Sequence, residues 1–222
     1  MNPEILFEDP YLSVVVKPPN MLSEDSDSPE SLARWLANRN PNGYIGVIHR
    51  LDRGVGGVMV YARTPEAAAN LSRAVAENRL QKEYLAVIHG EPEMQADSLS
   101  DLLFYDRMRS KSFVVDRERK GVKAALLDYR VLESVEHATY GRLSLLAVTL
   151  KTGRTHQIRV QFSSRRHPLV GDGKYGANDH CPIGLFSHRI TLEHPKTRQH
   201  MVFEKTPCDG VFAKFSCLQT KI

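Results

Sequence analysis

The sequence predicts an α+β fold with a largely antiparallel sheet. Three observations lead to this class: short β-branched runs recur along the chain, only a few segments have helical spacing and caps, and the two types do not alternate strictly. With 222 residues and 41% hydrophobic composition, the chain can bury a core of its own. We therefore expect one domain that spans residues 1–222.

The first half of the chain mixes strands and helices. A β-branched run that ends at Pro18 predicts a strand over Leu12–Lys17, because proline cannot donate to a continuing ladder. Ser28 as N-cap and Pro29 at the first helical position predict a helix. Its apolar stripe is Leu32, Trp35 and Leu36, with Trp35 expected in the core. The further elements expected here are strands at Ile45–Ile48, Val58–Ala62 and Lys82–Ile88, and a helix from Thr64-Pro65 in which Leu71 and Val75 have i, i+4 spacing.

The second half is expected to be mainly sheet. After Gly90 the pattern predicts a long irregular stretch. A short helix is expected at Thr155–Ser163, with Ile158 and Phe162 facing inward. The expected strands are Ser112–Val115, Val122–Leu132, Arg142–Leu150, Leu185–Leu192 and Met201–Glu204.

Composition limits the compartment and the class of partner. The formal net charge is +4, a mild excess that does not identify a polyanion partner by itself. Cys181, Cys208 and Cys217 match neither a disulfide framework nor a zinc site, so free thiols are expected. The N-terminus lacks the basic region of a signal peptide, and no run approaches the roughly 20 apolar residues of a membrane span. We expect a cytoplasmic protein with no membrane partner.

Basic residues concentrate in two segments. Residues 107–123 contain seven of them against two acids, and residues 151–166 contain five and no acid. A charge run of this kind is often a solvated face, and for the first segment that interpretation and a polyanion contact are equally supported. The basic residues are Arg107, Arg109, Lys111, Arg117, Arg119, Lys120 and Lys123 in the first segment, and Lys151, Arg154, Arg159, Arg165 and Arg166 in the second.

Several familiar motifs are excluded by their context. Gly171–Gly176 (GDGKYG) matches G-x-G-x-x-G, but no helix signal follows it, so a glycine-rich turn is expected in place of a dinucleotide site. The glycines after Asp52 lack the lysine that closes a phosphate-binding loop. No H-E-x-x-H zinc motif and no G-x-S-x-G serine-hydrolase motif occurs.

Three segments together carry residues suited to chemistry. They are His49–Asp52 (HRLD), Lys82–Ala86 (KEYLA) and Lys151–Val160 (KTGRTHQIRV). Each alone is ordinary: an Arg/Asp pair on a surface, a tyrosine packed in a strand, a solvated basic helix. In this order they resemble the RluA family of pseudouridine synthases, whose signatures are H-R-L-D, K-x-Y and T-G-R-T-H-Q-I-R.

The resemblance extends over nearly the whole chain, including Val16–Pro18, His167–Asp172 and Leu185–Pro195. It implies a pseudouridine-synthase-like catalytic domain with a bent, mixed, largely antiparallel sheet flanked by a few helices. No additional N-terminal RNA-binding module is expected. One departure follows Asp52: the family's usual Thr-Ser is replaced by Val55-Gly56. Either the loop lacks the hydrogen bonds of those hydroxyls, or the chain represents a subfamily with another substrate.

The resemblance implies the roles of three residues. Asp52 is expected to be the essential carboxylate at the ribose, Arg159 to pair with it, and Tyr84 to lie against the base as a platform and proton carrier. Burial disfavours the ionised form of a carboxylate, and a fixed arginine offsets that cost. Whether the carboxylate attacks a carbon or removes a ribose proton stays open.

The remaining candidates concern RNA. A uridine inside folded RNA must be extruded before its sugar can reach a buried carboxylate. Arg50 can fill the vacated stack with its planar guanidinium, or it forms a salt bridge within its own loop. The other expected RNA-binding residues are Arg154, His156, Gln157, Arg165, Arg166, Arg107, Arg109 and Lys111.

We expect a monomer that isomerises uridine in ribosomal or transfer RNA. Neither metal nor organic cofactor is expected, because the base serves as its own leaving group and nucleophile. One alternative is a non-catalytic RNA-binding or ribosome-assembly protein on the same scaffold, against which the presence of Asp52, Tyr84 and Arg159 together argues. The other is a nucleosidase or glycosidase, which needs a second carboxylate that the sequence does not indicate.

Overall fold

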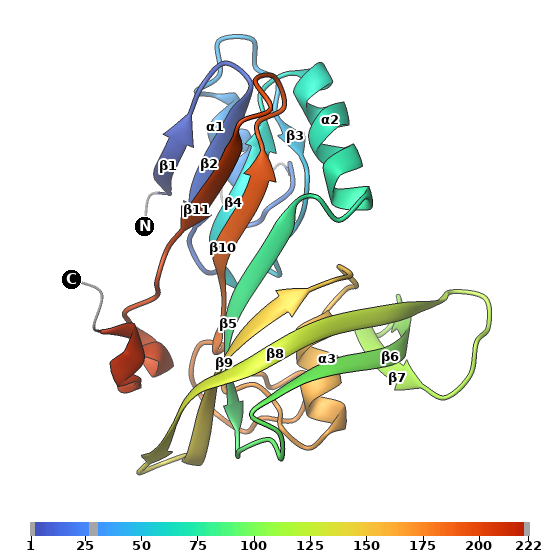
Figure 1. Cartoon of the computed structure of the whole chain (residues 1–222), viewed down its shortest axis with the longest axis vertical. Coiled ribbons are helices and arrows are strands. Elements are labelled where there is room, and N and C mark those ends of the chain that lie inside the picture. Colours follow the sequence, from blue (N-terminus) through green and yellow to red (C-terminus); the bar gives the residue numbers. More distant parts are fainter. Residues whose placement is uncertain (1–2, 27–30, 220–222) are drawn as a thin grey trace. The chain divides into compact units, whose positions relative to one another are not determined.

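The structure, a computed structural model, describes residues 3–26 and 31–219. The chain divides into two compact units, Met1–Lys82 with Phe186–Thr206, and Glu83–Leu185 with Pro207–Ile222. We call these the first and the second unit. Each contains its own set of paired strands, drawn in Figure 1.

The described residues of the first unit form six strands. Their order is β1-β2-β4-β10-β11, and β3 pairs with β4. The pairing of β4 with β10 is parallel, whereas β1–β2, β2–β4, β3–β4 and β10–β11 are antiparallel. The strands are β1 (Glu4–Glu8), β2 (Leu12–Lys17), β3 (Gly46–Val47), β4 (Gly56–Ala62), β10 (Leu185–Glu193) and β11 (His200–Glu204).

The part of the first unit that the structure describes contains two α-helices. Helix α1 (Leu32–Ala37) begins after Ser31, whose hydroxyl accepts a hydrogen bond from the backbone N–H of Arg34. Helix α2 (Pro65–Ala76) begins after Thr64, whose hydroxyl accepts one from Ala67. Because Pro65 lacks an N–H, it fits the first helical turn.

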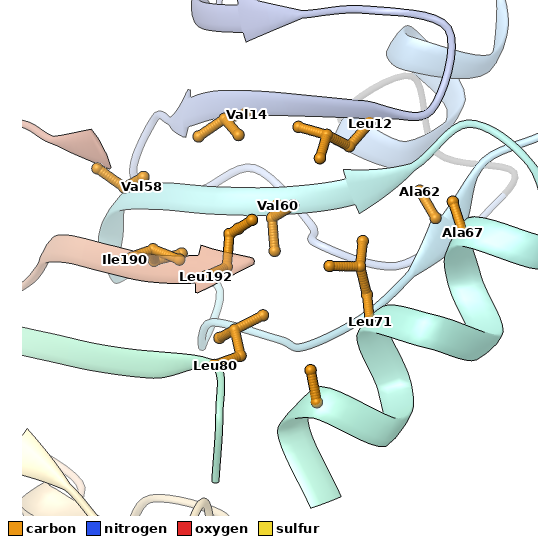
Figure 2. Close-up of a cluster of buried hydrophobic side chains, with 11 residues drawn as sticks. Leu12, Val14, Val58, Val60, Ala62, Ala67, Leu71, Leu80, Ile190 and Leu192 are labelled. Atoms are coloured by element: carbon orange, nitrogen blue, oxygen red, sulfur yellow. The ribbon is translucent and has the colours of Figure 1, made fainter. Parts of the chain in front are cut away.

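Helix α2 closes the main core of the first unit. Its inner side chains face β4, β2 and β10, as Figure 2 shows for Leu71 opposite Val60 and Leu192. Burial of such side chains contributes about 1.5 to 3 kcal/mol each. The buried members are Leu12, Val14, Val58, Val60, Ala62, Ala67, Leu71, Ala74, Leu80, Ile190 and Leu192.

The second unit is an antiparallel sheet with one α-helix among its described residues. The strand order is β5-β9-β8-β6-β7. Helix α3 (Gln157–Ser164) lies against β6 and β7, where the buried Gln161 donates to the carboxylate of Asp101 at 2.7 Å. The strands are β5 (Gln81–His89), β6 (Ala96–Asp106), β7 (Lys111–Val115), β8 (Val122–His137) and β9 (Gly141–Leu150). Two short 3-10 helices follow β11, at Gly210–Lys214 and Ser216–Leu218.

The predicted α+β class with a largely antiparallel, mixed sheet is confirmed. The irregular stretch expected after Gly90 is wrong, because β6 occupies residues 96–106 of it. Strand β1 was not predicted. The predicted cap at Ser28 and Pro29 lies outside the described residues, and α1 begins four residues later than Ser28, at Leu32. Trp35 is only half-buried, with the guanidinium of Arg39 4.9 Å from its ring centre.

Candidate active site

Asp52 lies in the first unit, on the loop between β3 and β4. It opens a tight turn that closes when the Val55 N–H donates to the Asp52 carbonyl at 2.9 Å. The preceding residue, Leu51, is fixed on both sides by the buried Ser23. The Ser23 hydroxyl accepts from the Leu51 N–H at 3.1 Å and donates to the Leu51 carbonyl at 3.0 Å. The backbone next to Asp52 is therefore fixed by Ser23, a residue outside the loop.

A second support is the fully buried side chain of Lys17, at the end of β2. Its ammonium donates to the carbonyl oxygens of Pro18 at 3.1 Å, Met21 at 2.7 Å and Arg53 at 3.1 Å. Burial lowers the pKa of Lys17 to about 8, and the negative charge of Asp52 opposes this shift. At neutral pH the group is still mainly protonated, so the loop that carries Asp52 is held by a buried cation.

This buried lysine gives a pH-dependent prediction. Between about pH 8 and pH 10.5 the unfolded chain binds the Lys17 proton and the folded chain does not, so stability from this group rises with pH. Relative to Lys17→Met, the wild type should gain about 1 to 3 kcal/mol of unfolding free energy over this range. Urea unfolding of both proteins at several pH values measures the difference. Parallel pH profiles would show that Lys17 carries no shifted pKa.

His49 anchors the start of the same loop. It is buried, and its Nε2 accepts a hydrogen bond from the Val60 N–H of β4 at 3.2 Å, which leaves the ring proton on Nδ1. Burial, and to a smaller extent the charge of Lys82, together lower the pKa of His49 to about 3. The imidazole is therefore neutral at physiological pH. Its hydrogen bond with Val60 connects the loop to β4.

The glycines after Asp52 allow close approach of backbone. Gly57 has φ +123°, and a Cβ there would lie 2.3 Å from the Ser187 carbonyl oxygen of β10. A Cβ at Gly56 would lie 3.2 Å from the Lys17 carbonyl oxygen and from Pro19. The loop is thus packed tightly where the family's usual hydroxyls are absent. Ser23 and Lys17, which the sequence did not indicate as site residues, supply hydrogen bonds to it.

Arg50 is exposed and forms an ion pair with Glu24 at 2.8 Å. Both side chains are more than half exposed, at 61% and 58%. An exposed pair of this kind contributes about 0 to 1 kcal/mol. Opening the pair therefore costs little free energy. The stacking role of Arg50 stays a prediction.

In the second unit, Tyr84 lies on β5 opposite Val148 of β9 and is 6% exposed. Three further candidates lie where α3 begins: Arg154 and His156 just before the helix, and Gln157 as its first residue. Gln157 is buried: its amide oxygen accepts from Thr152 at 2.8 Å and from the Arg154 N–H at 3.0 Å, and its amide nitrogen donates to the Leu126 carbonyl. These bonds give Gln157 a structural task, while its contact with RNA stays a prediction.

Arg159 forms a bidentate ion pair with Asp172. Its Nε and Nη2 each lie 2.7 Å from a carboxylate oxygen of Asp172. The arginine side chain is 12% exposed and the aspartate 1%. The aromatic ring of Tyr175 lies 5.1 Å from the guanidinium carbon. Sequence reasoning did not identify Asp172 or Tyr175. The predicted pair of Arg159 with Asp52 joins residues of different units and stays a prediction.

The other basic candidates also lie on the second unit. Arg165 is partly exposed and pairs with Asp101 of β6 at 2.9 Å, and Arg166 is exposed. Arg107 and Arg109 are exposed on the turn between β6 and β7. The remaining candidates are Arg154, which donates to the Ala124 carbonyl, His156, which bonds the Tyr175 hydroxyl, and Lys111, which donates to the Lys174 carbonyl.

Lys174 was not predicted. Its ammonium donates to the Ser110 carbonyl at 3.0 Å while Lys111 donates to the Lys174 carbonyl at 2.6 Å. These reciprocal bonds fix the basic β6–β7 turn to the Gly171–Gly176 loop. The turn that carries Arg107 and Arg109 is thus bonded to the same loop whose Asp172 pairs with Arg159.

Within residues 3–26 and 31–219, no cluster of three or more histidine, cysteine or acidic side chains has the arrangement of a metal site. Over the same residues, no helix is long and apolar enough to cross a membrane. The three cysteines are free, as predicted.

Comparison with known proteins shows which family the sequence matches. The family model described as RNA pseudouridylate synthase matches residues 11–164. Ribosomal large subunit pseudouridine synthase D of Nitrosomonas europaea is 30% identical, over 97% of this chain and 65% of the relative. tRNA pseudouridine synthase C of Salmonella typhimurium is also 30% identical, over 90% of this chain and 84% of the relative.

Solved structures show the same fold. Human RNA Pseudouridylate Synthase Domain Containing 1 superposes with a TM-score of 0.76 at 21% identity, over 99% of this chain and 96% of that one. Human RNA Pseudouridylate Synthase Domain Containing 4 gives 0.73 at 22% identity, over 91% and 87%. The fold agrees with the pseudouridine synthase class that the family model and the sequence relatives define.

The chain belongs to the RNA pseudouridylate synthase family. At the level of the family, the prediction of an isomerase that modifies RNA is confirmed.

Proposed function

We propose that this chain converts one or more uridines to pseudouridine in structured ribosomal or transfer RNA, with Asp52 as the essential carboxylate. The observation that carries the proposal is that the backbone on both sides of Asp52 is fixed by hydrogen bonds. Ser23 fixes the backbone before it, and the buried ammonium of Lys17 bonds the carbonyl of the residue after it. A rigid loop with a buried cation suits a carboxylate that must stay ionised against a substrate.

The chemistry explains why one carboxylate is sufficient. The bond between the ribose C1′ and the uracil N1 breaks, the base turns, and C1′ bonds to C5. The proton on C5 is then lost, and N1 gains one. Cleavage builds positive charge on the ribose or requires a nucleophile there, and an ionised aspartate serves either need. No second carboxylate is needed as general acid.

Arg159 and Tyr84 complete the proposed site. We assign to Arg159 the stabilisation of the ionised Asp52, and to Tyr84 a position against the base. Two charge-assisted bonds to Asp172 fix the Nε–Nη2 edge of the guanidinium. We assign to Arg50 the task of filling the position that the extruded uridine leaves in the base stack. Its weak ion pair with Glu24 must open for this.

The substrate class rests on the relatives and on the charge distribution. One relative is named for the large ribosomal subunit and another for transfer RNA, and both are about equally similar to this chain. The exposed Arg107, Arg109 and Arg166 supply cations for phosphates. The chain is expected to bind a folded RNA stem-loop mainly through its backbone and shape.

The test is an isomerisation assay with purified protein. Ribosomal and transfer RNA lacking modifications are incubated with the protein, and pseudouridine is mapped by carbodiimide modification and reverse transcription. We expect modification at discrete uridines. RNA binding without any pseudouridine would instead support the alternative of a non-catalytic RNA-binding or assembly protein.

Salt dependence tests the basic surface. The double change Arg165→Glu and Arg166→Glu should weaken RNA binding and reduce the slope of log affinity against log salt by about 1 to 2, because each lost phosphate contact releases one counterion fewer. Filter binding over a salt series measures the slope. The matched control is Arg189→Glu, which breaks a surface pair with Glu204 in the first unit and should leave the slope unchanged. An unchanged slope in the double variant would place both arginines off the RNA surface.

A further inference from the structure

The proposed function assigns no role to the Gly171–Gly176 loop. Its sequence resembles a dinucleotide motif, but its side chains point to another task. Asp172 is 1% exposed, and both of its carboxylate oxygens bond the guanidinium of Arg159. A buried charge is tolerated only when it is paired, so the carboxylate is held where it is by the arginine, and the arginine by the carboxylate.

The backbone of the loop fixes the position of Asp172. Gly171 has φ +74°, and a Cβ there would lie 2.5 Å from the Pro182 carbonyl oxygen, so only glycine fits. The Asp172 N–H donates to the Leu169 carbonyl, and the Asp172 carbonyl accepts from Tyr175 and Ala177. The loop is thus closed on both sides of the aspartate.

Tyr175 supplies a second contact with Arg159. Its ring lies 5.1 Å from the guanidinium carbon, at cation–π distance. Its hydroxyl accepts from the Ser112 N–H at 2.7 Å and bonds His156 Nδ1 at 2.9 Å. The ring is therefore anchored at its far end to β7 and to the start of α3. A guanidinium with one edge bonded and one face covered has few orientations left.

We infer that Asp172 and Tyr175 are positioning residues for Arg159. They form a bracket that orients the guanidinium for its proposed role, the stabilisation of the catalytic carboxylate. This inference rests on the proposed function, because the bracket matters for the reaction only if Arg159 does. The bracket itself is a property of the second unit alone.

A double-mutant cycle in kcat tests the inference. Asp172→Asn keeps the shape but removes the charge, and it should lower kcat by about 10- to 100-fold with the KM for RNA within about threefold. In the Arg159→Met background the same change should have no further effect beyond about threefold, because the residue it positions is gone. If the fold-losses of kcat from the two changes multiply in the double variant, Asp172 acts independently of Arg159, and the inference is overturned.

Controls separate positioning from stability. Glu8→Gln breaks the ion pair of Arg63, an arginine as buried as Arg159 at 11% exposed, and should lower the melting temperature without lowering kcat. If Asp172→Asn does not fold, Tyr175→Leu removes the ring but leaves the ion pair. We expect about a tenfold loss of kcat from it, again absent in the Arg159→Met background. A folded Tyr175→Leu with wild-type kcat would contradict the bracket.

A second readout does not depend on activity. The melting-temperature losses of Arg159→Met and Asp172→Asn should be strongly non-additive in the double variant, whatever the substrate. Additive losses would overturn the bracket while the proposed function stands. If the melting-temperature losses are non-additive but the wild-type protein forms no pseudouridine, the proposed function is overturned. The contact of Asp172 with Arg159 then has a structural role only.

Discussion

Asp52→Asn should reduce pseudouridine formation below detection while RNA affinity stays within several fold. The amide has nearly the shape of the carboxylate but carries no negative charge, so it can neither act as a nucleophile at the ribose nor remove a ribose proton. The hydrogen bonds of Ser23 and Lys17 to the loop go to backbone atoms of neighbouring residues, so the change leaves them in place, although it removes the charge that opposes the lowering of the Lys17 pKa. Single-turnover assays with excess enzyme, together with filter binding, measure both quantities.

The matched control for this substitution is Asp9→Asn in the same unit. Asp9 also lies in a loop, where its carboxylate accepts from the N–H groups of Tyr11 and Leu12 and pairs with His194. The same chemical change there should cost stability and leave turnover intact. Near-normal turnover by Asp52→Asn would mean that another group is the catalyst.

Arg159→Met should lower both activity and stability. The substitution removes the proposed partner of Asp52, and we expect kcat to fall by about 100-fold or more, since lost charge stabilisation of about 2.7 to 4 kcal/mol has this effect. It also leaves the fully buried Asp172 carboxylate without its arginine. Such an uncompensated buried charge costs about 3 to 5 kcal/mol of unfolding free energy. Urea unfolding and single-turnover kinetics on one preparation measure the two losses.

The two substitutions therefore differ in kind. Asp52→Asn should fold normally and be inactive, whereas Arg159→Met should be slow and unstable. Part of the stability lost in Arg159→Met should return when Asp172→Asn is added, because the remaining partner is then neutral. Arg159→Met with wild-type kcat would separate this arginine from the reaction.

The elements that local sequence signals define were predicted well. Strand β2 has the predicted bounds, Leu12–Lys17, because Pro18 stops the ladder there. Helix α2 begins at Pro65 after the Thr64 cap, as predicted. Strand β6 was missed because Asp97, Ser98, Ser100 and Asp101 make it look like a loop. Its inner face is defined by contacts distant in sequence, as when Asp101 bonds Gln161 on α3.

The site was predicted in part, for the same reason. Motif spacing identifies Asp52, Tyr84 and Arg159 as candidates but does not show what holds them. The bond from Lys17 to the Arg53 carbonyl spans 36 residues, and Asp172 lies 13 residues after Arg159. Both supports lie in stretches that contributed to the family resemblance, Val16–Pro18 and His167–Asp172. Only the fold shows that Lys17 bonds the loop of Asp52 and that Asp172 binds Arg159.

The central claim is that Asp52 of this chain makes pseudouridine in RNA. Its most direct test is carbodiimide mapping of total RNA from cells that lack the gene, complemented with the wild-type chain or with Asp52→Asn at equal expression. We predict that one or more discrete pseudouridines in ribosomal or transfer RNA disappear without the gene, return with the wild type and stay absent with Asp52→Asn. An unchanged pseudouridine map without the gene, or full restoration by Asp52→Asn, would contradict the claim.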